Sequence, residues 1–140
     1  MDMRETRISG EYFFEGRIMK ARVDEVRLPN GKQASREVCE HVGGVGVLPV
    51  DRSGNIILVR QFRYPYDTEL LEIPAGKLDH GAEDFTACGA RELKEETGCT
   101  AGRIVPLGAQ YPSPGFLTEV VHLFAALDLT EGEMPPDEDD

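Results

Sequence analysis

The sequence has few cysteines, no long apolar run and a shortage of basic residues. Its three cysteines, Cys39, Cys88 and Cys99, form no Cys-x-x-Cys or Cys/His cluster. Isolated thiols in odd number argue against a disulfide framework or a zinc site and indicate a reducing compartment. No apolar segment approaches the ~18 residues of a transmembrane helix, and the charged N-terminus lacks a signal-peptide pattern. We therefore expect a cytoplasmic protein without a membrane partner.

The chain also lacks the charge and the loop expected of common nucleotide- and nucleic-acid-binding classes. Its formal net charge is −11 at pH 7, and six of the acidic residues lie in the last ten positions. An acidic surface argues against nucleic acid as the default partner. The glycines of residues 43–46 precede no Gly-Lys-Ser/Thr and no helix pattern, so they do not form a phosphate-binding loop. With 140 residues, one domain with a buried core is expected.

The most informative stretch is residues 76–99. Residues 83–97 suit a helix, and Gly98 is a natural helix terminator. Glu92 and Glu96 lie four residues apart and therefore share one helix face. Like charges at this spacing repel each other, so the face is either solvated or holds a cation. Oxygen ligands without Cys or His favour Mg²⁺ or Mn²⁺.

Strands dominate the rest of the chain. Alternating residues 4–28, the turn signal Pro29-Asn30-Gly31 and a returning strand to Val42 predict an antiparallel N-terminal sheet. Further strands are expected at 43–50, 56–59, 70–73, 104–109 and 120–127, with a loop at 111–116. The pattern predicts an α+β fold in a single domain, residues 1–140. Its expected parts are the N-terminal sheet (1–42), a core (43–129) and an acidic tail or loop (130–140).

A family resemblance extends this interpretation. Glu83 is followed by seven residues and then by the segment 91–99, which reads Arg-Glu-Leu-Lys-Glu-Glu-Thr-Gly-Cys. This resembles the Nudix box, Gly-x5-Glu-x7-Arg-Glu-U-x-Glu-Glu-x-Gly-U, where U is an apolar residue. One extra residue separates Gly76 from Glu83. The resemblance implies a Nudix-type α/β/α sandwich with a mixed central sheet. Nudix domains usually continue with another strand and a second helix, so it also implies a shortened C-terminus, through a trimmed fold or a truncated chain.

Motifs outside the box are similar to the ADP-ribose pyrophosphatase branch of that family. They are Val59-Arg60-Gln61-Phe62-Arg63-Tyr64-Pro65, Leu71-Glu72-Ile73-Pro74-Ala75-Gly76-Lys77-Leu78 and Ser113-Pro114-Gly115-Phe116. The resemblance implies Mg²⁺-dependent hydrolysis of ADP-ribose, or a similar nucleoside diphosphate sugar, to AMP and ribose 5-phosphate, with Mn²⁺ as an alternative metal. Other nucleotide-sugar hydrolases share these motifs in part.

The resemblance also assigns roles to individual residues. The metal ligands would be the carbonyl of Ala75 and the side chains of Glu92, Glu95 and Glu96. Glu95 and Arg91 would belong to the catalytic set, with Arg91 orienting a glutamate through the i,i+4 contact.

Substrate contacts are implied for Arg36, Arg63, Glu72, Gly76 and Leu78. Arginine suits bidentate phosphate binding, whereas surface ion pairs are the alternative for both arginines. Glu72 would contact the adenine edge or a ribose.

The general base is expected in an acidic loop, and the segment Asp137-Glu138-Asp139-Asp140 suggests Glu138, with Asp140 as an extra metal contact. A tail with no catalytic role is the alternative. Glu119 is a minor site candidate. Tyr12 and Phe14 either stack on a base or pack in a core or interface.

Two other functions stay open at this point. One is a Nudix-fold sensor that binds ADP-ribose or another nucleotide sugar without hydrolysing it, and the other is a Nudix hydrolase of a dinucleotide. The retained Arg91, Glu92, Glu95 and Glu96 disfavour the sensor. The resemblance further implies a homodimer whose N-terminal sheets pack together or exchange.

Overall fold

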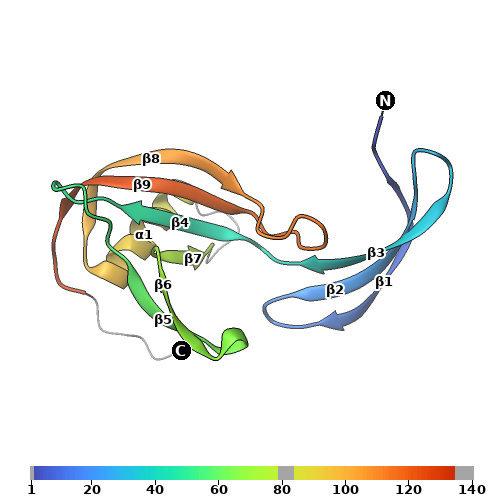
Figure 1. Cartoon of the computed structure of the whole chain (residues 1–140), viewed down its shortest axis with the longest axis horizontal. Helices are drawn as coiled ribbons and strands as arrows, with labels where there is room; N and C mark the ends of the chain where they lie inside the picture. Colours follow the sequence, from blue (N-terminus) through green and yellow to red (C-terminus); the bar gives the residue numbers. More distant parts are fainter. Residues whose placement is uncertain (1, 79–83, 135–140) are drawn as a thin grey trace. The chain divides into compact units, whose positions relative to one another are not determined.

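A computed structural model describes residues 2–78 and 84–134, and the chain divides into two compact units (Figure 1). The N-terminal unit contains the chain up to Gly43 together with Tyr111–Val120. The helical unit contains Gly44–Gln110 and the chain from Val121 onward. Each unit is described separately below.

The N-terminal unit is built on a three-stranded sheet in the order β1-β2-β3. Its antiparallel strands are β1 (Thr6–Glu15), β2 (Lys20–Arg27) and β3 (Gln33–Glu40). The turn between β2 and β3 is closed by the Gly31 N–H, which donates to the Leu28 carbonyl at 2.9 Å, and Gly31 has a φ of +84°. The predicted antiparallel N-terminal sheet is thus confirmed. The alternating residues 4–28 form two strands rather than one, because the chain turns at Gly16, whose N–H donates to the Met19 carbonyl.

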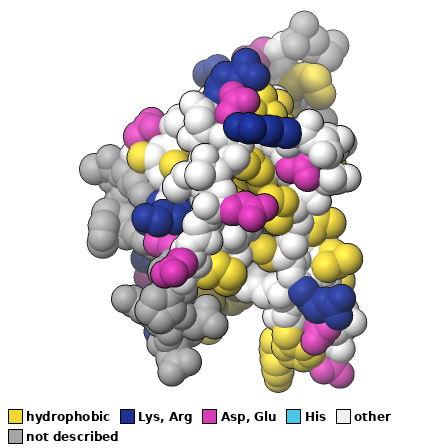
Figure 2. Space-filling view, turned by 90° about the vertical axis from the view of Figure 1, so that its left-hand side faces the viewer, with side chains coloured by type: hydrophobic (Ala, Val, Ile, Leu, Met, Phe, Trp, Pro, Cys, Tyr) yellow, Lys and Arg dark blue, Asp and Glu magenta, His cyan; other side chains and the backbone are white. Residues whose placement is uncertain are grey.

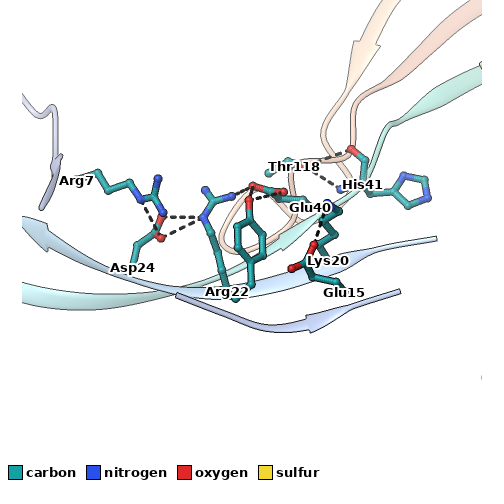
Figure 3. A network of polar contacts seen from close by, with 9 residues as sticks. Arg7, Glu15, Lys20, Arg22, Asp24, Glu40, His41 and Thr118 are labelled. Carbon is teal, nitrogen blue, oxygen red and sulfur yellow. Dashed lines mark hydrogen bonds and ion pairs between the residues drawn. The ribbon is translucent and has the colours of Figure 1, made fainter. Parts of the chain in front are cut away.

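A polar network joins the three strands (Figure 3). The Asp24 carboxylate is only 5% exposed and contacts both Arg7 and Arg22. Arg22 also pairs with Glu40, which accepts a hydrogen bond from the Tyr12 hydroxyl at 3.1 Å. Burial alone raises the pKa of Asp24, but the hydrogen bonds and charges of the two arginines outweigh it and lower that pKa. Ion pairs and a tyrosine hydrogen bond therefore link all three strands of this sheet.

The predicted loop at 111–116 is confirmed, and it is attached to the end of β3. The Cys39 N–H donates to the Phe116 carbonyl at 2.7 Å, and the Thr118 N–H donates to the Cys39 carbonyl at 2.9 Å. The Thr118 hydroxyl accepts a hydrogen bond from the His41 N–H at 3.0 Å. These contacts explain why this loop belongs to the N-terminal unit although its neighbours in sequence do not.

The helical unit contains a four-stranded mixed sheet in the order β7-β4-β9-β8. The strands are β4 (Gly44–Pro49), β7 (Ala75–Lys77), β8 (Thr100–Gln110) and β9 (Val121–Thr130). β4 and β9 run parallel, and the other pairs are antiparallel. A separate hairpin is formed by β5 (Val59–Arg63) and β6 (Thr68–Glu72), joined through the 3-10 turn Tyr64–Tyr66. The mixed central sheet is therefore as predicted.

Helix α1 (Phe85–Thr97) packs against the sheet (Figure 1). It begins at Asp84, whose carboxylate accepts from the Thr86 and Ala87 N–H groups, and ends at Gly98 with a φ of +72°. Gly89 lets the helix approach β4 closely, since an added Cβ would lie 3.2 Å from Val47. The core between helix and sheet consists of two clusters of buried residues: Val47, Leu93, Cys99 and Ala126, and Val45, Cys88 and Phe124.

One predicted strand is wrong. Residues 56–58 form only an isolated bridge between Ile56 and Val50, and β5 begins at Val59. The turn at Asp51, held by Asn55, sends the chain back over the end of β4, where the Ile57 N–H donates to the Pro49 carbonyl at 3.1 Å.

The α+β class is confirmed, and α1 is the one α-helix within residues 2–78 and 84–134. The second helical layer of the expected sandwich is not present in those ranges. No helix in the same ranges is long and apolar enough to cross a membrane. Figure 2 shows one face of the chain, where side chains of both charge signs lie among hydrophobic ones.

Candidate functional site

The acidic face of α1 meets the start of β7. The backbone N–H of Ala75 donates to the Glu96 carboxylate at 3.1 Å. Ala75 can reach the helix because Pro74, which is fully buried, ends the segment after β6 and directs the chain into β7. The first residue of β7 and a residue of the last turn of α1 are thus brought into contact, although 21 positions separate them.

Arg91 contacts the carboxylates of both Glu92 and Glu95. Its Nη1 lies 2.8 Å from a Glu92 oxygen and 2.9 Å from a Glu95 oxygen. Its Nη2 donates to the Lys77 carbonyl at 3.3 Å and lies 3.5 Å from the Cys88 sulfur. Both glutamates therefore face a single positive charge, and the same guanidinium ties the helix to β7.

Gly76 lies directly against the Glu92 carboxylate. A Cβ built on Gly76 would overlap all three carboxylate atoms of that side chain. Any larger residue at this position would displace Glu92, so the glycine provides the space that the carboxylate occupies. This close approach gives Gly76 a role beside the acidic face that does not depend on substrate contact.

Partial burial of Glu92 and Glu96 distinguishes this face from an ordinary solvated one. The Glu92 residue is 8% exposed. Burial raises the pKa of Glu92, with Arg91 opposing the shift, and neighbouring Glu95 and Glu96 raise that pKa further. Burial also raises the pKa of Glu96, and the Ala75 N–H and the Arg63 charge oppose that shift. Carboxylates that are partly removed from water and crowded together are stabilised in their charged form by a cation.

The donor chemistry fits a hard divalent cation. Glu92, Glu95 and Glu96 offer carboxylate oxygens only, and the missing side chain of Gly76 leaves room for the Glu92 carboxylate. No three His, Cys, Asp or Glu side chains in the described ranges are already grouped around one point. Instead Glu92 and Glu95 contact Arg91, and Glu96 contacts the Ala75 amide.

Arg63 and Glu72, at the ends of β5 and β6 in the helical unit, form an ion pair with two hydrogen bonds. The Arg63 Nε and Nη2 donate to the two Glu72 oxygens at 2.7 and 2.6 Å. The hydrogen bonds to Glu72 raise the pKa of Arg63, and those from Arg63 lower the pKa of Glu72. Glu72 lies three residues before Ala75, whose N–H donates to Glu96, so this pair lies near the acidic face. The Arg63 charge lowers the pKa of Glu96, and the Glu72 charge raises it.

The remaining candidates from the sequence are placed elsewhere. Leu78 packs against the buried cluster of Val45, Cys88 and Phe124. Arg36 lies in the N-terminal unit, where its guanidinium makes two contacts with Glu5 at 2.7 and 2.9 Å.

Other minor candidates also have partners within the N-terminal unit. Glu119 lies 3.4 Å from His41, and Tyr12 binds Glu40. Phe14 is 51% exposed. Glu138 and Asp140 lie outside the described residues. A hollow of about 240 Å³ in this unit, next to Ile18 and Met19, includes none of the residues that the sequence suggested as site residues.

Two contacts of Arg91 were not anticipated from sequence. Cys88 and the Lys77 carbonyl both accept from its guanidinium. The i,i+3 spacing of Cys88 and Arg91 on one helix could have indicated the first contact. The second joins the helix to another element and has no sequence signal.

Comparison with known proteins identifies the family of the chain. Residues 40–140 match the family described as NUDIX domain, and residues 5–39 match the family described as nucleoside diphosphate sugar hydrolase N-terminal domain. The boundary between the two matches lies near the end of β3.

Individual relatives match over most of the chain. An ADP-ribose pyrophosphatase of Bacillus subtilis (strain 168) is 45% identical over 99% of this chain and 75% of its own length. A methanol dehydrogenase activator of Bacillus methanolicus is 41% identical over 92% of this chain and 69% of its own length. The crystal structure of an ADP compounds hydrolase has the same fold, with a TM-score of 0.83 at 20% identity, covering 99% of this chain and 76% of that one.

Proposed function

The chain belongs to the NUDIX family and is a Nudix hydrolase, and from that premise we propose that it hydrolyses ADP-ribose, or a closely similar nucleoside diphosphate sugar. One water is consumed, the diphosphate P–O–P linkage breaks, and AMP and ribose 5-phosphate are released. The observation that carries the proposal is the acidic face of α1, where Glu92 is buried against Gly76 and Glu96 binds the Ala75 N–H. The similarity to the ADP-ribose pyrophosphatase of Bacillus subtilis over nearly the whole chain supports the substrate.

Nudix hydrolases generally use a divalent cation, and we propose Mg²⁺, with Mn²⁺ as the alternative. The Ala75 carbonyl and the carboxylates of Glu92, Glu95 and Glu96 would hold it. When bound, such a cation neutralises diphosphate charge and activates water. Arg91 positions Glu92 and Glu95, because one guanidinium nitrogen contacts both side chains.

The proposed substrate contacts in the helical unit are Arg63, Gly76 and Leu78. Arg63 would bind a phosphate, Gly76 lies in β7, and Leu78 follows that strand. A guanidinium can bind phosphate through two parallel hydrogen bonds. Arg36 remains a proposed contact in the N-terminal unit, where it would have to exchange Glu5 for the substrate. Glu138 remains the proposed general base.

We also propose that the chain acts as a cytoplasmic homodimer. All ten residues of β1 are exposed in the single chain, including Ile8, Tyr12, Phe13 and Phe14. An exposed edge strand with apolar side chains is a surface suited to pairing with a second copy.

The test is AMP release from ADP-ribose with and without Mg²⁺, alongside ADP-glucose, GDP-mannose and NADH. Metal-dependent release that is fastest with ADP-ribose is the expected result. Preference for NADH would identify a dinucleotide hydrolase instead. Saturable binding of ADP-ribose without turnover would overturn hydrolysis in favour of a sensor.

A further inference from the structure

We propose that Glu72 is a positioning residue that holds the Arg63 guanidinium in place for the substrate diphosphate, and does not itself contact the base or ribose. This inference rests on the proposed function and deepens it. It replaces the direct substrate contact that the sequence suggested for Glu72.

The contact between the two side chains is specific in geometry. Both nitrogens on one edge of the guanidinium, Nε and Nη2, meet both oxygens of Glu72, at 2.7 and 2.6 Å. Side-on pairing of this kind fixes the plane of the guanidinium, whereas a single contact leaves it free to rotate. The Arg63 side chain is 40% exposed and that of Glu72 is 23% exposed, so the pair is accessible to a ligand.

The hairpin makes this contact by extending both side chains along one face. Arg63 is opposite Thr68 in the ladder, and Glu72 is opposite Val59, so the two partners are not cross-strand neighbours. Alternation along the strands places Arg63 and Glu72 on the same side. An exposed ion pair of this reach adds little to stability, because ordering two long side chains costs conformational entropy. Orientation of the guanidinium is the effect that the pairing achieves.

Three N–H groups of Arg63 remain for a ligand. A guanidinium carries five N–H donors, and Glu72 takes two of them. Among residues 2–78 and 84–134, Glu72 is the one acceptor of an Arg63 hydrogen bond. The remaining donors therefore suit a second anion. Glu72, which holds Arg63, lies three residues before Ala75, and the Ala75 N–H binds Glu96, so the guanidinium lies near the acidic face. A diphosphate there would accept hydrogen bonds from the remaining N–H groups of the Arg63 guanidinium, while Nε and Nη2 stay bound to Glu72.

The same hairpin supplies a matched control. Arg60 and Glu69 form an ion pair at 3.4 Å on its opposite face, with side chains 70% and 60% exposed. Because Glu69 takes no part in the site, Glu69→Gln removes a carboxylate from the same hairpin without touching Arg63.

The experiment compares wild type, Glu72→Gln, Arg63→Gln, the double variant and Glu69→Gln. The kcat and KM for ADP-ribose are measured at saturating Mg²⁺, together with the unfolding temperature. Glu72→Gln should raise KM on the order of tenfold, as expected for loss of a supporting contact, and change kcat much less. Adding Glu72→Gln to Arg63→Gln should change KM no further, because Glu72 acts through Arg63. Glu69→Gln should match wild type.

Additive effects on KM would overturn the proposal, since Glu72 would then act on the substrate independently of Arg63. An unchanged KM in Glu72→Gln, or a KM rise equally large in Glu69→Gln, would overturn it as well. If wild type hydrolyses none of the nucleotides, the proposed function fails, and the inference is decided by binding of inorganic pyrophosphate with Mg²⁺ to the same five proteins. Binding about tenfold weaker in Glu72→Gln supports it; equal binding in wild type and Glu72→Gln overturns it.

Discussion

At the residue scale, Glu96 is partly buried and its carboxylate accepts one backbone hydrogen bond. Its carboxylate accepts from the Ala75 N–H, and burial raises its pKa. A glutamine at this position can keep the hydrogen bond through its amide oxygen while losing the charge. The charge and the local structure at this position can therefore be tested separately.

Glu96→Gln should lower kcat for ADP-ribose by about two orders of magnitude or more, because loss of a metal-ligand charge is worth several kcal/mol. Its unfolding temperature without metal should equal or exceed that of wild type, since a poorly solvated charge is removed. Hydrolysis rates and thermal unfolding measure the two effects. Turnover at the wild-type rate would show that the metal assignment on this helix is wrong.

Asp24 leads to a pH-dependent prediction. Its pKa in the folded chain lies below the ordinary value of 3.8, so its carboxylate stabilises the fold above that pH. This contribution is lost as the pH falls through the folded-state pKa, because protonation breaks the contacts with Arg7 and Arg22. Asp24→Asn should thus unfold at a lower temperature than wild type at pH 7, and the difference should shrink below pH 3.8.

Thermal unfolding followed by circular dichroism from pH 3 to pH 7 measures this difference. Glu25→Gln is the control, because Glu25 is exposed on the same strand. A difference between Asp24→Asn and wild type that stays constant with pH would contradict the assignment to the carboxylate.

At the element scale, the box helix depends on its caps. Asp84 accepts hydrogen bonds from the Thr86 and Ala87 N–H groups at 3.1 and 3.2 Å. Gly98 has a φ of +72°, and an added Cβ there would approach the Gly132 carbonyl at 2.7 Å. The two caps fix the ends of the segment that carries Arg91, Glu92 and Glu96.

Asp84→Ala should destabilise the chain by about 1 kcal/mol, because two helix N–H groups lose their acceptor. For a chain of this size, that corresponds to roughly 2–5 °C in the unfolding temperature. Asp84→Ser, which retains a capping oxygen, should restore most of the loss. Equal unfolding temperatures for the two variants would show that the side-chain cap does not contribute.

Local rules explain most of the correctly predicted elements. The helix was predictable from its spacing and from Gly98, and the hairpin at Gly31 from Pro29-Asn30-Gly31. Residues 56–58 were misassigned because a β-branched, apolar run predicts a strand whether or not a neighbouring strand is available. In the fold, the turn after Asp51 leaves this run paired only at Ile56.

At the scale of the whole molecule, the N-terminal sheet is the part least able to bury its own apolar surface. Phe13 is 67% exposed and Phe14 is 51% exposed. A sheet of three strands held by ion pairs has little core of its own. Covering this surface by a second copy would bury it without requiring another domain.

Light scattering should therefore give twice the chain mass of 15.5 kDa. Phe13→Glu should shift the mass toward that of one chain, because a charge on the paired surface is costly to bury. A single-chain mass for wild type would exclude the homodimer. The expected division of the chain into an N-terminal sheet (1–42), a core (43–129) and an acidic tail or loop (130–140) also stays a prediction.

The sequence by itself determined the family, the α+β class, the box helix and the residues of its acidic face, because these follow from composition and fixed spacing along the chain. Only the tertiary structure decided that Glu92 is buried against Gly76, that Glu72 binds Arg63, and that the loop at 111–120 is attached to β3. Such contacts join residues that lie on different elements. They depend on strand register and packing, which no local pattern specifies.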